Sequence, residues 1–313
     1  MKKFNSGSDA VIQLNNLTKT FGGHHAVNNV SLEVNRGEIY GFLGLNGAGK
    51  STTIHMMLSL SKPTSGNVYM LGQKVDFGSY ELWKKVGFLE EANFYPDLTV
   101  EENLDISRRM QLLPDTQCVS HIIEKFGLEP HKNKKAKNLS MGNRQRMGLA
   151  KAMIHNPEIL ILDEPINGLD PEGVVEVREM LLYLSKKCGV TIFLSSHLLK
   201  ELEKLADRIG IIHEGRLIQE IEMTYLEHSL RKYLFLTGRN QNAMKRVLLE
   251  HGYCFEENAD GQLILEESHV IEEPEKVNEL LVRSGQPPTQ LSVVTEDLEG
   301  YFLRTIQSTR GSF

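Results

Sequence analysis

Short apolar runs alternate with amphipathic segments along residues 1–222, and this alternation predicts the fold. Five runs of four or five residues are almost wholly apolar, at 39–43, 86–89, 159–162, 191–194 and 209–212. Segments with the 3.6-residue period of a helix separate most of them, at 50–62, 99–113, 116–126, 140–156, 174–187 and 198–206. Strands that are apolar throughout are buried on both faces. We therefore predict an α/β fold whose mostly parallel sheet carries helices on both faces.

Local signals predict further strands and the ends of two helices. Residues 11–20, 31–34 and 68–71 have strand character. Thr99 and Glu102 have the spacing of a capping box, which predicts a helix running to about Leu113. The helix after Lys50 is expected to bury Leu60 and to stop before Pro63.

The pattern changes near residue 222, and it predicts a second domain. Strands are expected at 233–237 and 262–266, and helices at 242–251, 277–284 and 297–307. This part contains no motif comparable to those described below. We therefore predict a large domain at 1–222 and a small α+β accessory domain at 223–313.

Composition narrows the class of protein. The chain has 313 residues, 40% of them hydrophobic and 24% charged, which is ordinary for a soluble globular protein. The net charge of −6 disfavours a nucleic-acid partner. The three cysteines are widely spaced, as expected of reduced thiols in the cytoplasm. No stretch is long and apolar enough to cross a bilayer and the N-terminus lacks a signal core, so any membrane attachment needs a partner.

The run at 39–43 opens into a glycine-rich loop, Gly44-x-x-x-x-Gly49-Lys50-Ser51, and then into a helix. Glycines let successive backbone N–H groups point at one anion, and the helix adds the positive end of its dipole. Lys50 supplies a cation for the β- and γ-phosphates, and the Ser51 hydroxyl can ligate Mg²⁺. The predicted nucleotide-binding residues of this loop are Gly44, Leu45, Asn46, Gly47, Ala48, Gly49, Lys50, Ser51 and Thr52.

Three polar residues follow other apolar runs, where parallel sheets hold their ligand groups. Asp163 is predicted to join Ser51 at the metal, and Glu164 to act as general base for a water. An adjacent Asp-Glu pair alone is more often a solvated strand end, but this one follows four apolar residues and precedes Pro165. His197, after the run at 191–194, is expected to reach the γ-phosphate.

Together these residues resemble the ATP-binding subunit of ABC transporters over residues 11 to about 222. The glycine-rich loop resembles the family's Walker A motif, and residues 159–164 its Walker B strand. Residues 139–146 resemble its signature motif and residues 167–170 its D-loop, while His197 resembles its switch histidine. Phe21 lies where the family has an aromatic that stacks on adenine. The implied fold is a P-loop NTPase cassette with an N-terminal antiparallel β part and a helical subdomain at about 92–157.

The resemblance implies a head-to-tail dimer of ATP-binding subunits, homomeric or heteromeric, with ATP and Mg²⁺ as ligands. Each ATP would lie between the Walker A loop of one copy and Ser140, Gly142 and Asn143 of the other. Ser140 is also an N-cap candidate, so its helix would offer N–H groups to the γ-phosphate. Asp170 would carry communication across the dimer. ATP hydrolysis would drive a separate membrane subunit, which would hold the chain at the inner face of the membrane.

Two positions depart from the family pattern. The signature is usually Leu-Ser-Gly-Gly-Gln, whereas this chain has Met141 for the first glycine and Asn143 for the glutamine. The family usually has a glutamine near the metal, and this chain has Glu90 or Glu91 at that position. Counting forward from the strand at 86–89 and counting back from the residues that follow select different glutamates. Glutamate at this position is typical of the subgroup that resembles bacitracin- and lantibiotic-exporting ATPases. The C-terminal extension of that subgroup is similar in size to residues 223–313.

These features leave three functional hypotheses. The leading one is an ATPase subunit that drives export of a drug, peptide antibiotic or amphiphile. The altered signature keeps open a regulatory subunit that hydrolyses ATP weakly beside a better catalytic partner. A soluble ABC protein acting on ribosomes or DNA is disfavoured, because such members resemble tandem cassettes or carry long coiled-coil insertions, and this chain has neither.

Overall fold

The computed structural model describes residues 9–90, 94–258 and 261–310. The chain divides into two compact units, Met1–Thr224 and Tyr225–Phe313. Within the described residues, no helix has both the length and the apolar character that crossing a bilayer requires. The first unit has two sheets and the second has one, and each unit has its own hydrophobic core.

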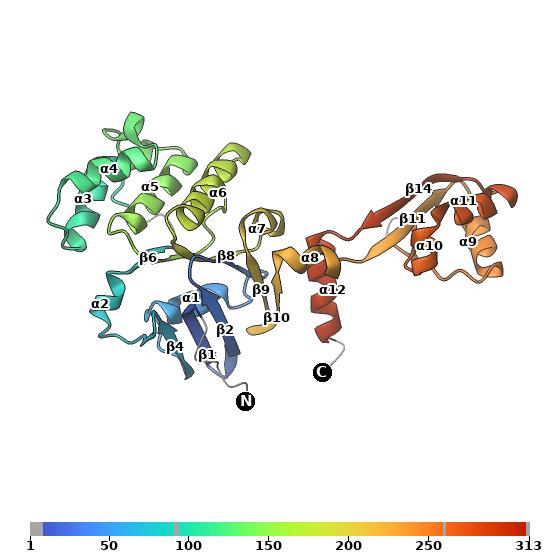
Figure 1. The fold of residues 1–313 in the computed structure, drawn as a ribbon, viewed down its shortest axis with the longest axis horizontal. Coiled ribbons are helices and arrows are strands. Elements are labelled where there is room, and N and C mark those ends of the chain that lie inside the picture. The colour runs from blue at the N-terminus through green and yellow to red at the C-terminus, as the bar shows by residue number, and fades with distance from the viewer. Residues whose placement is uncertain (1–8, 91–93, 259–260, 311–313) are drawn as a thin grey trace. The chain divides into compact units, whose positions relative to one another are not determined.

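The first unit is organised around a six-stranded sheet, which confirms the predicted parallel arrangement (Figure 1). Its strands lie in the order β10, β9, β3, β8, β7, β6, and all but β10 run parallel to their neighbours. The bounds are β10 Arg216–Glu222, β9 Arg208–His213, β3 Ile39–Leu43, β8 Thr191–Ser196, β7 Ile159–Leu162 and β6 Val86–Leu89. The antiparallel edge strand β10 is absent from the sequence prediction.

A second, antiparallel sheet covers one face of the central sheet. It consists of β2 His24–Asn35, β1 Ala10–Phe21, β4 Ser65–Met70 and β5 Gln73–Lys74. Its apolar side chains share one core with helix α1 (Lys50–Met57) and with Tyr40 and Phe193 of the central sheet, whose rings stack 5.6 Å apart. The prediction that Leu60 is buried was wrong: α1 ends at Met57, and Leu60 is 63% exposed.

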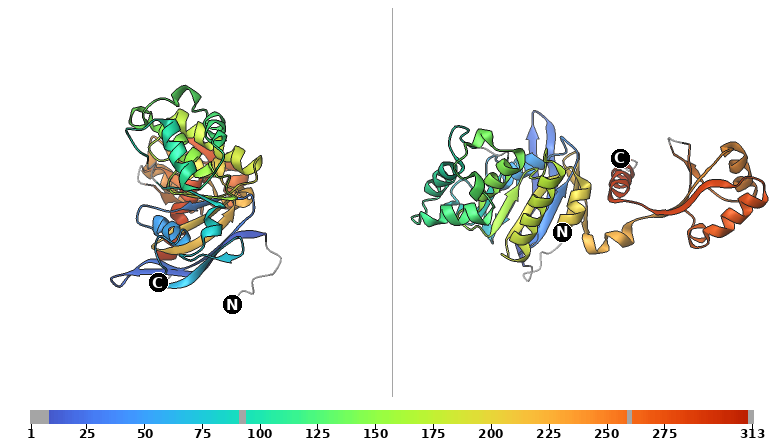
Figure 2. Two further views of the ribbon diagram at one scale, coloured as in Figure 1. Left: turned by 90° about the vertical axis from the view of Figure 1, so that its left-hand side faces the viewer. Right: turned by 90° about the horizontal axis from the view of Figure 1, so that it is seen from above.

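Helices cover the opposite face of the central sheet. They are α5 Met141–Met153, α6 Pro171–Lys186 and α7 Leu199–Leu205. In Figure 1 and the left view of Figure 2, the green helices and the blue strands lie on opposite sides of the sheet. A Cβ on Gly41 of β3 would lie 2.9 Å from Leu202 of α7, so this glycine allows close packing. The parallel arrangement brings the carboxyl ends of all five parallel strands to one edge of the sheet.

A helical subdomain is inserted between β6 and β7. Its elements are α3 Val100–Met110, α4 Gln117–Lys125 and the 3₁₀ turns η1 Glu129–His131 and η2 Ala136–Asn138, followed by α5. The predicted capping box is confirmed: Glu102 N–H donates to Thr99 Oγ1 at 3.2 Å, and Thr99 N–H donates to the Glu102 carboxylate at 2.7 Å. A short helix, α2 Tyr80–Trp83, precedes β6.

Thr99→Ala is expected to lower the free energy of unfolding by about 1 kcal/mol, because it leaves the Glu102 N–H without its cap. Thr116→Ala is the matched control, since Thr116 precedes α4 but its side chain makes no capping hydrogen bond. Urea unfolding of the full chain measures both. Equal effects of the two substitutions would contradict a specific role for the Thr99 cap.

The second unit is a four-stranded antiparallel sheet with its own helices. Its strands lie in the order β12 Glu256–Glu257, β13 Leu263–Leu265, β11 Lys232–Gly238 and β14 Pro288–Thr295. Leu234 and Leu236 of β11 pack with α9 Gln241–Glu250 and α11 Pro274–Arg283 around one core. The remaining helices are α8 Met223–Ser229, α10 Ser268–Glu272 and α12 Leu298–Arg310.

Candidate functional site

The residues predicted to act on phosphate lie beyond the carboxyl ends of adjacent parallel strands. Gly44 follows β3, His197 follows β8 and Asp163 follows β7, and these three strands are neighbours in the sheet. Gly44 N–H donates to Ser196 O at 3.3 Å, which ties the start of the loop to the end of β8. This edge is where open α/β sheets bind their ligands.

The glycine-rich loop has a backbone that only glycine adopts readily. Gly47 has φ +81° and Gly49 has φ +106°. A Cβ on Gly49 would also lie 2.4 Å from the carbonyl oxygen of Ala26 in β2, so a side chain there would clash. Helix α1 begins at Lys50, directly after the loop, and presents its unpaired N–H groups toward it. This geometry fits a phosphate group.

Lys50 and Glu164 form the centre of the site. The Lys50 side chain is 6% exposed, and its Nζ donates to Gly44 O at 2.7 Å and lies 3.1 Å from Glu164 Oε1. The other carboxylate oxygen of Glu164 lies 2.8 Å from His197 Nδ1. Glu164 therefore bridges the loop lysine and the strand-end histidine. Its φ of +50° is unusual for a residue with a side chain and is typical of functional sites.

Ser195 connects the Asp163 carboxylate to the backbone of Glu164, and sequence reasoning missed it. Its Oγ donates to Asp163 Oδ1 at 2.5 Å and accepts a hydrogen bond from Glu164 N–H at 3.0 Å. Ser195 is completely buried at the end of β8. A serine two residues before His197, inside an apolar strand, was the available signal. It holds the Asp163 carboxylate and the backbone of Glu164 in fixed positions.

The donor set at this edge fits a magnesium ion. Ser51 lies in the first turn of α1, and Asp163 lies at the end of β7. A hydroxyl and a carboxylate, completed by phosphate oxygens and water, are the oxygen ligands that Mg²⁺ takes in nucleotide sites. Glu90, which follows β6, is hydrogen-bonded to His55 of α1, with 2.6 Å between Glu90 Oε1 and His55 Nε2. Glu91, the other candidate for this position, lies outside the described residues.

Phe21 ends the first strand of a hairpin. It pairs with His24 across Gly22 and Gly23, and its ring is 54% exposed. His24 begins strand β2, and Ala26 of that strand lies against Gly49 of the phosphate-binding loop. Lys19 Nζ lies 4.9 Å from the centre of the Phe21 ring. An exposed aromatic face near this loop is available for stacking on a base.

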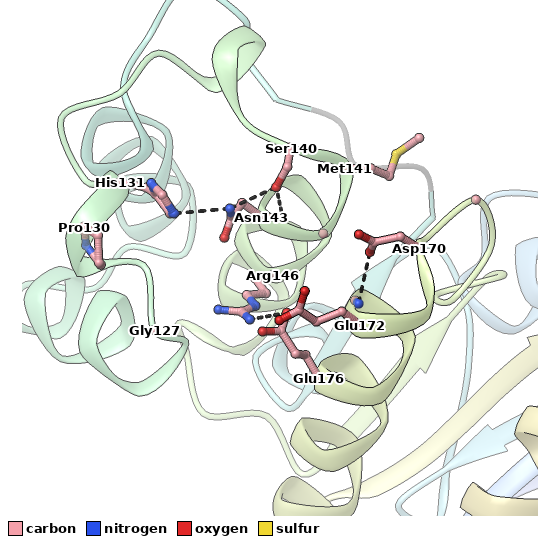
Figure 3. Close-up of a pocket in the computed structure, with 13 residues that line it drawn as sticks. Gly127, Pro130, His131, Ser140, Met141, Asn143, Arg146, Asp170, Glu172 and Glu176 are labelled. Carbon is pink, nitrogen blue, oxygen red and sulfur yellow. Dashed lines mark hydrogen bonds and ion pairs between the residues drawn. The ribbon is translucent and has the colours of Figure 1, made fainter.

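The signature residues lie at a second place in the first unit. Ser140 caps α5, and its Oγ accepts from Asn143 N–H at 3.3 Å. A cavity of about 560 Å³ opens beside this helix start, lined in part by His131, Asn143, Arg146 and Glu176 (Figure 3). Arg146 is ion-paired with Glu176 across the cavity floor. Met141, at the altered signature position, is 54% exposed.

Asp170 holds the start of α6 beside this cavity. Its Oδ1 accepts from Gly173 N–H at 3.0 Å, so Asp170 is the N-cap of α6. A Cβ on Gly142 would lie 3.9 Å from Gly173 Cα, which shows how closely the starts of α5 and α6 approach. The predicted D-loop residue and the predicted signature residues are thus neighbours.

The predicted residues therefore form two groups. The loop, Asp163, Glu164 and His197 lie together at the sheet edge. Within the described residues, no hydrogen bond or ion pair joins Ser140 or Asn143 to Lys50 or Glu164.

Comparison with known proteins shows close relatives. The family model described as "ABC transporter" matches residues 27–167. The chain is 39% identical to the bacitracin transport ATP-binding protein BcrA of Bacillus licheniformis, over 95% of this chain and 97% of that protein. It is 41% identical to BcrA of Enterococcus faecalis, over 95% and 96%. It is also 36% identical to the lantibiotic transport ATP-binding protein SrtF of Streptococcus pyogenes, over 68% and 91%.

Solved structures agree with the fold. The chain superposes on the ATP-binding cassette MJ0796, described as dimeric, in a post-hydrolysis state and bound to ADP and Pi. The TM-score is 0.62 at 28% identity, covering 68% of this chain and 98% of that one. CbiO1 of Clostridium perfringens, part of the transporter complex cbiONQ, gives a TM-score of 0.65 at 25% identity, covering 77% and 96%. The predicted P-loop cassette fold is confirmed.

Proposed function

Because this chain belongs to the ABC transporter family as an ATP-binding subunit, we propose that it hydrolyses ATP to drive export of a peptide antibiotic of the bacitracin type. One observation carries the proposal: Lys50, Glu164 and His197 are joined by direct contacts at one edge of the sheet. The names of the full-length relatives support the choice of cargo. A separate membrane subunit would form the transport path.

ATP binding would begin at the glycine-rich loop. The N–H groups of residues 44–52 and the N-terminus of α1 would surround the β-phosphate, and the exposed ring of Phe21 would stack on adenine. Lys50 would exchange its contacts with Gly44 O and Glu164 for the β- and γ-phosphate oxygens. Ser51 and Asp163, with Glu90 or Glu91, would hold Mg²⁺, which neutralises phosphate charge when bound.

Hydrolysis would then depend on Glu164. Once Lys50 turns to the phosphates, Glu164 Oε1 is free to accept a proton from an attacking water. Glu164 Oε2 remains beside His197, so the histidine can orient the carboxylate and sense the γ-phosphate. Ser195 keeps the Glu164 backbone in place through its N–H. In this scheme Glu164 is the general base and His197 positions it.

A second copy, or a related subunit, would complete the site. Ser140 begins α5, and its N–H groups are directed to a ligand outside this subunit. Asn143 and Gly142 lie in the first turn of the same helix, and Asp170 is their neighbour at the start of α6. Head-to-tail pairing would set this helix start against the γ-phosphate held by the other copy. ATP would thus hold the dimer together, and hydrolysis would release it.

One observation favours a weaker catalytic role. The exposed Met141 occupies the first position of α5, where the family pattern has glycine. A side chain at this position reduces the space for a phosphate approaching the helix start. A regulatory subunit beside a more active partner would have this property. The ATP turnover of such a regulatory subunit would hardly change when Glu164 is replaced. This result separates the regulatory hypothesis from the hypothesis of an active ATPase subunit.

The cargo can be tested in the cell that makes this protein. Deletion of the chain is expected to lower the bacitracin concentration that stops growth at least fourfold, because export would be lost. The wild-type chain should restore resistance, whereas Lys50→Ala should not. Growth with a lantibiotic and with an unrelated drug measures the breadth of the cargo. Unchanged bacitracin sensitivity after deletion would contradict the proposed cargo.

A further inference from the structure

The side chain of Asn143 lies between His131 and Ser140 (Figure 3). Asn143 Nδ2 is 2.9 Å from Ser140 Oγ and 3.2 Å from His131 Nε2. The amide group of asparagine has two N–H bonds, so it can donate to both neighbours at once. His131 comes from the 3₁₀ turn η1, whereas Asn143 and Ser140 belong to the start of α5. Sequence reasoning did not single out His131.

This arrangement leaves the Ser140 hydroxyl a single role. Its oxygen accepts from Asn143 N–H at 3.3 Å and from Asn143 Nδ2 at 2.9 Å. A serine hydroxyl has two acceptor positions and one donor, and both acceptor positions are occupied here. The remaining O–H can only donate. The residue is exposed, so this donor is available to an anion that arrives from outside the subunit.

The orientation of the Asn143 amide decides whether the Ser140 hydroxyl can donate to a ligand outside the subunit. If the amide were rotated by half a turn, Oδ1 would face Ser140 and would accept the serine proton. The hydroxyl would then point at Asn143 and away from a ligand. A neutral His131 whose Nε2 accepts a hydrogen bond allows only Nδ2 to face it. The neutral His131 tautomer protonated on Nδ1 has this acceptor at Nε2, and it therefore selects the orientation in which Ser140 donates outward.

We propose that His131 is a positioning residue for nucleotide hydrolysis: it fixes the Asn143 amide and so holds the Ser140 hydroxyl as a donor to the γ-phosphate bound by the second copy. This inference rests on the proposed function. It assigns a role to a residue outside the signature motif. It also supplies a reason why asparagine works at a position where the family has glutamine.

The surroundings of His131 favour its neutral form. Burial, Lys134 and Arg146 all lower the pKa of the His131 imidazole from its ordinary value. Glu172 and Glu176 of α6 and Asp170 line the same cavity, and Glu129 lies on the same turn as His131. Arg146 is paired with Glu176, which offsets part of that negative charge.

Protonation of His131 reverses the preferred orientation of the Asn143 amide. Nε2 of a charged imidazole carries a proton and donates, so it must face Oδ1 of the amide. The amide then rotates, so that Oδ1 faces Ser140 and accepts a hydrogen bond from its hydroxyl, and the donor to the phosphate is lost. Because the pKa of the His131 imidazole is lowered, the donor is lost only at pH values below the ordinary histidine pKa of about 6.5. The predicted result is an acidic limb in kcat.

The test measures kcat and KM for MgATP from pH 5.5 to 8.5 with the full chain. His131→Phe keeps an aromatic ring at this position but removes the acceptor nitrogen. It is expected to lower kcat at pH 7.5 about tenfold, as for one lost hydrogen bond. The affinity of the subunit for ATP should stay unchanged, because the glycine-rich loop is intact. His131→Gln supplies an acceptor oxygen that does not titrate. It should keep kcat within about threefold and should lose the acidic limb. His121→Phe, an exposed histidine on α4, is the matched control.

Three results would overturn the inference while leaving the proposed function intact. They are an active wild type with an equally active His131→Phe, a His131→Gln that fails as badly as His131→Phe, and a His131→Gln that keeps the acidic limb. The first denies any role, the second shows that an acceptor at residue 131 is not what hydrolysis requires, and the third assigns the pH effect elsewhere. A wild-type chain that binds ATP but never hydrolyses it would overturn the proposed function and this inference together.

Discussion

Lys50→Ala is expected to lower the affinity of the chain for ATP at least about 100-fold. The Lys50 side chain is 6% exposed, and its ammonium group lies 2.7 Å from Gly44 O and 3.1 Å from Glu164. It is the cation that the loop directs at the phosphates. Two charge-assisted hydrogen bonds of about 1.5 kcal/mol or more each account for this factor. Titration of the purified chain with ATP measures it.

Lys62→Ala is the control for this experiment. Lys62 is an exposed lysine shortly after the same helix, and its loss should leave the affinity unchanged. Thermal unfolding of both variants checks that the fold is intact. An ATP affinity of Lys50→Ala equal to that of the wild type would mean that residues 44–51 do not form the phosphate-binding site.

Glu164→Gln is expected to lower kcat for ATP hydrolysis by about 10²–10⁴-fold, the usual contribution of a general base. Glutamine has nearly the same shape, so the contacts around residue 164 are largely kept, but its amide cannot take a proton from water. ATP affinity should fall little, because the loop and Lys50 are unchanged. The measurement is phosphate release under saturating ATP, with affinity determined in parallel.

Glu201→Gln is the matched control for a carboxylate in an ion pair. Glu201 of α7 lies 2.9 Å from Arg178 and is about as buried as Glu164, but it takes no part in the contacts at the sheet edge. Its loss should leave kcat within about twofold. Equal turnover of the wild type and Glu164→Gln would instead support the regulatory hypothesis, in which residual hydrolysis needs no base.

The central sheet could be predicted because its strands are buried on both faces. Residues 159–162 are four apolar residues in a row, and they form β7 with all four side chains buried. The same reasoning failed for β10, where Arg216, Glu220 and Glu222 interrupt the apolar pattern of an edge strand. Strand β14 was missed because Thr, Gln and Ser alternate with its apolar residues. Edge strands face solvent on more sides, so their sequences carry a weaker signal.

Boundaries depended on contacts that are distant in sequence. The strand predicted at 68–71 already begins at Ser65 as β4, because Gly66 packs directly against the backbone of Asn15 and Asn16 in β1. The helix after Lys50 was predicted to stop just before Pro63 but ends at Met57, and Ser59 has φ +59°. Neither effect is visible in a local window of sequence.

The site was predictable at the level of motifs but not of contacts. Asp163, Glu164 and His197 could be placed at the sheet edge because each follows an apolar strand. The left-handed backbone of Glu164, the link through Ser195 and the His55–Glu90 hydrogen bond depend on how neighbouring strands and helices meet. For the same reason His131 carried no signal, since its partner Asn143 is 12 residues away on another element.

In the proposed dimer one ATP site is built from two cassettes, and the first pairing to test is that of two copies of this chain. The most direct measurement is the mass of the Glu164→Gln chain in solution, by light scattering during size-exclusion chromatography. With MgATP it is expected to have twice the monomer mass, and without nucleotide, or with Ser140→Arg added at the start of α5, it should be a monomer. A Glu164→Gln chain that binds ATP and still runs as a monomer would contradict the account.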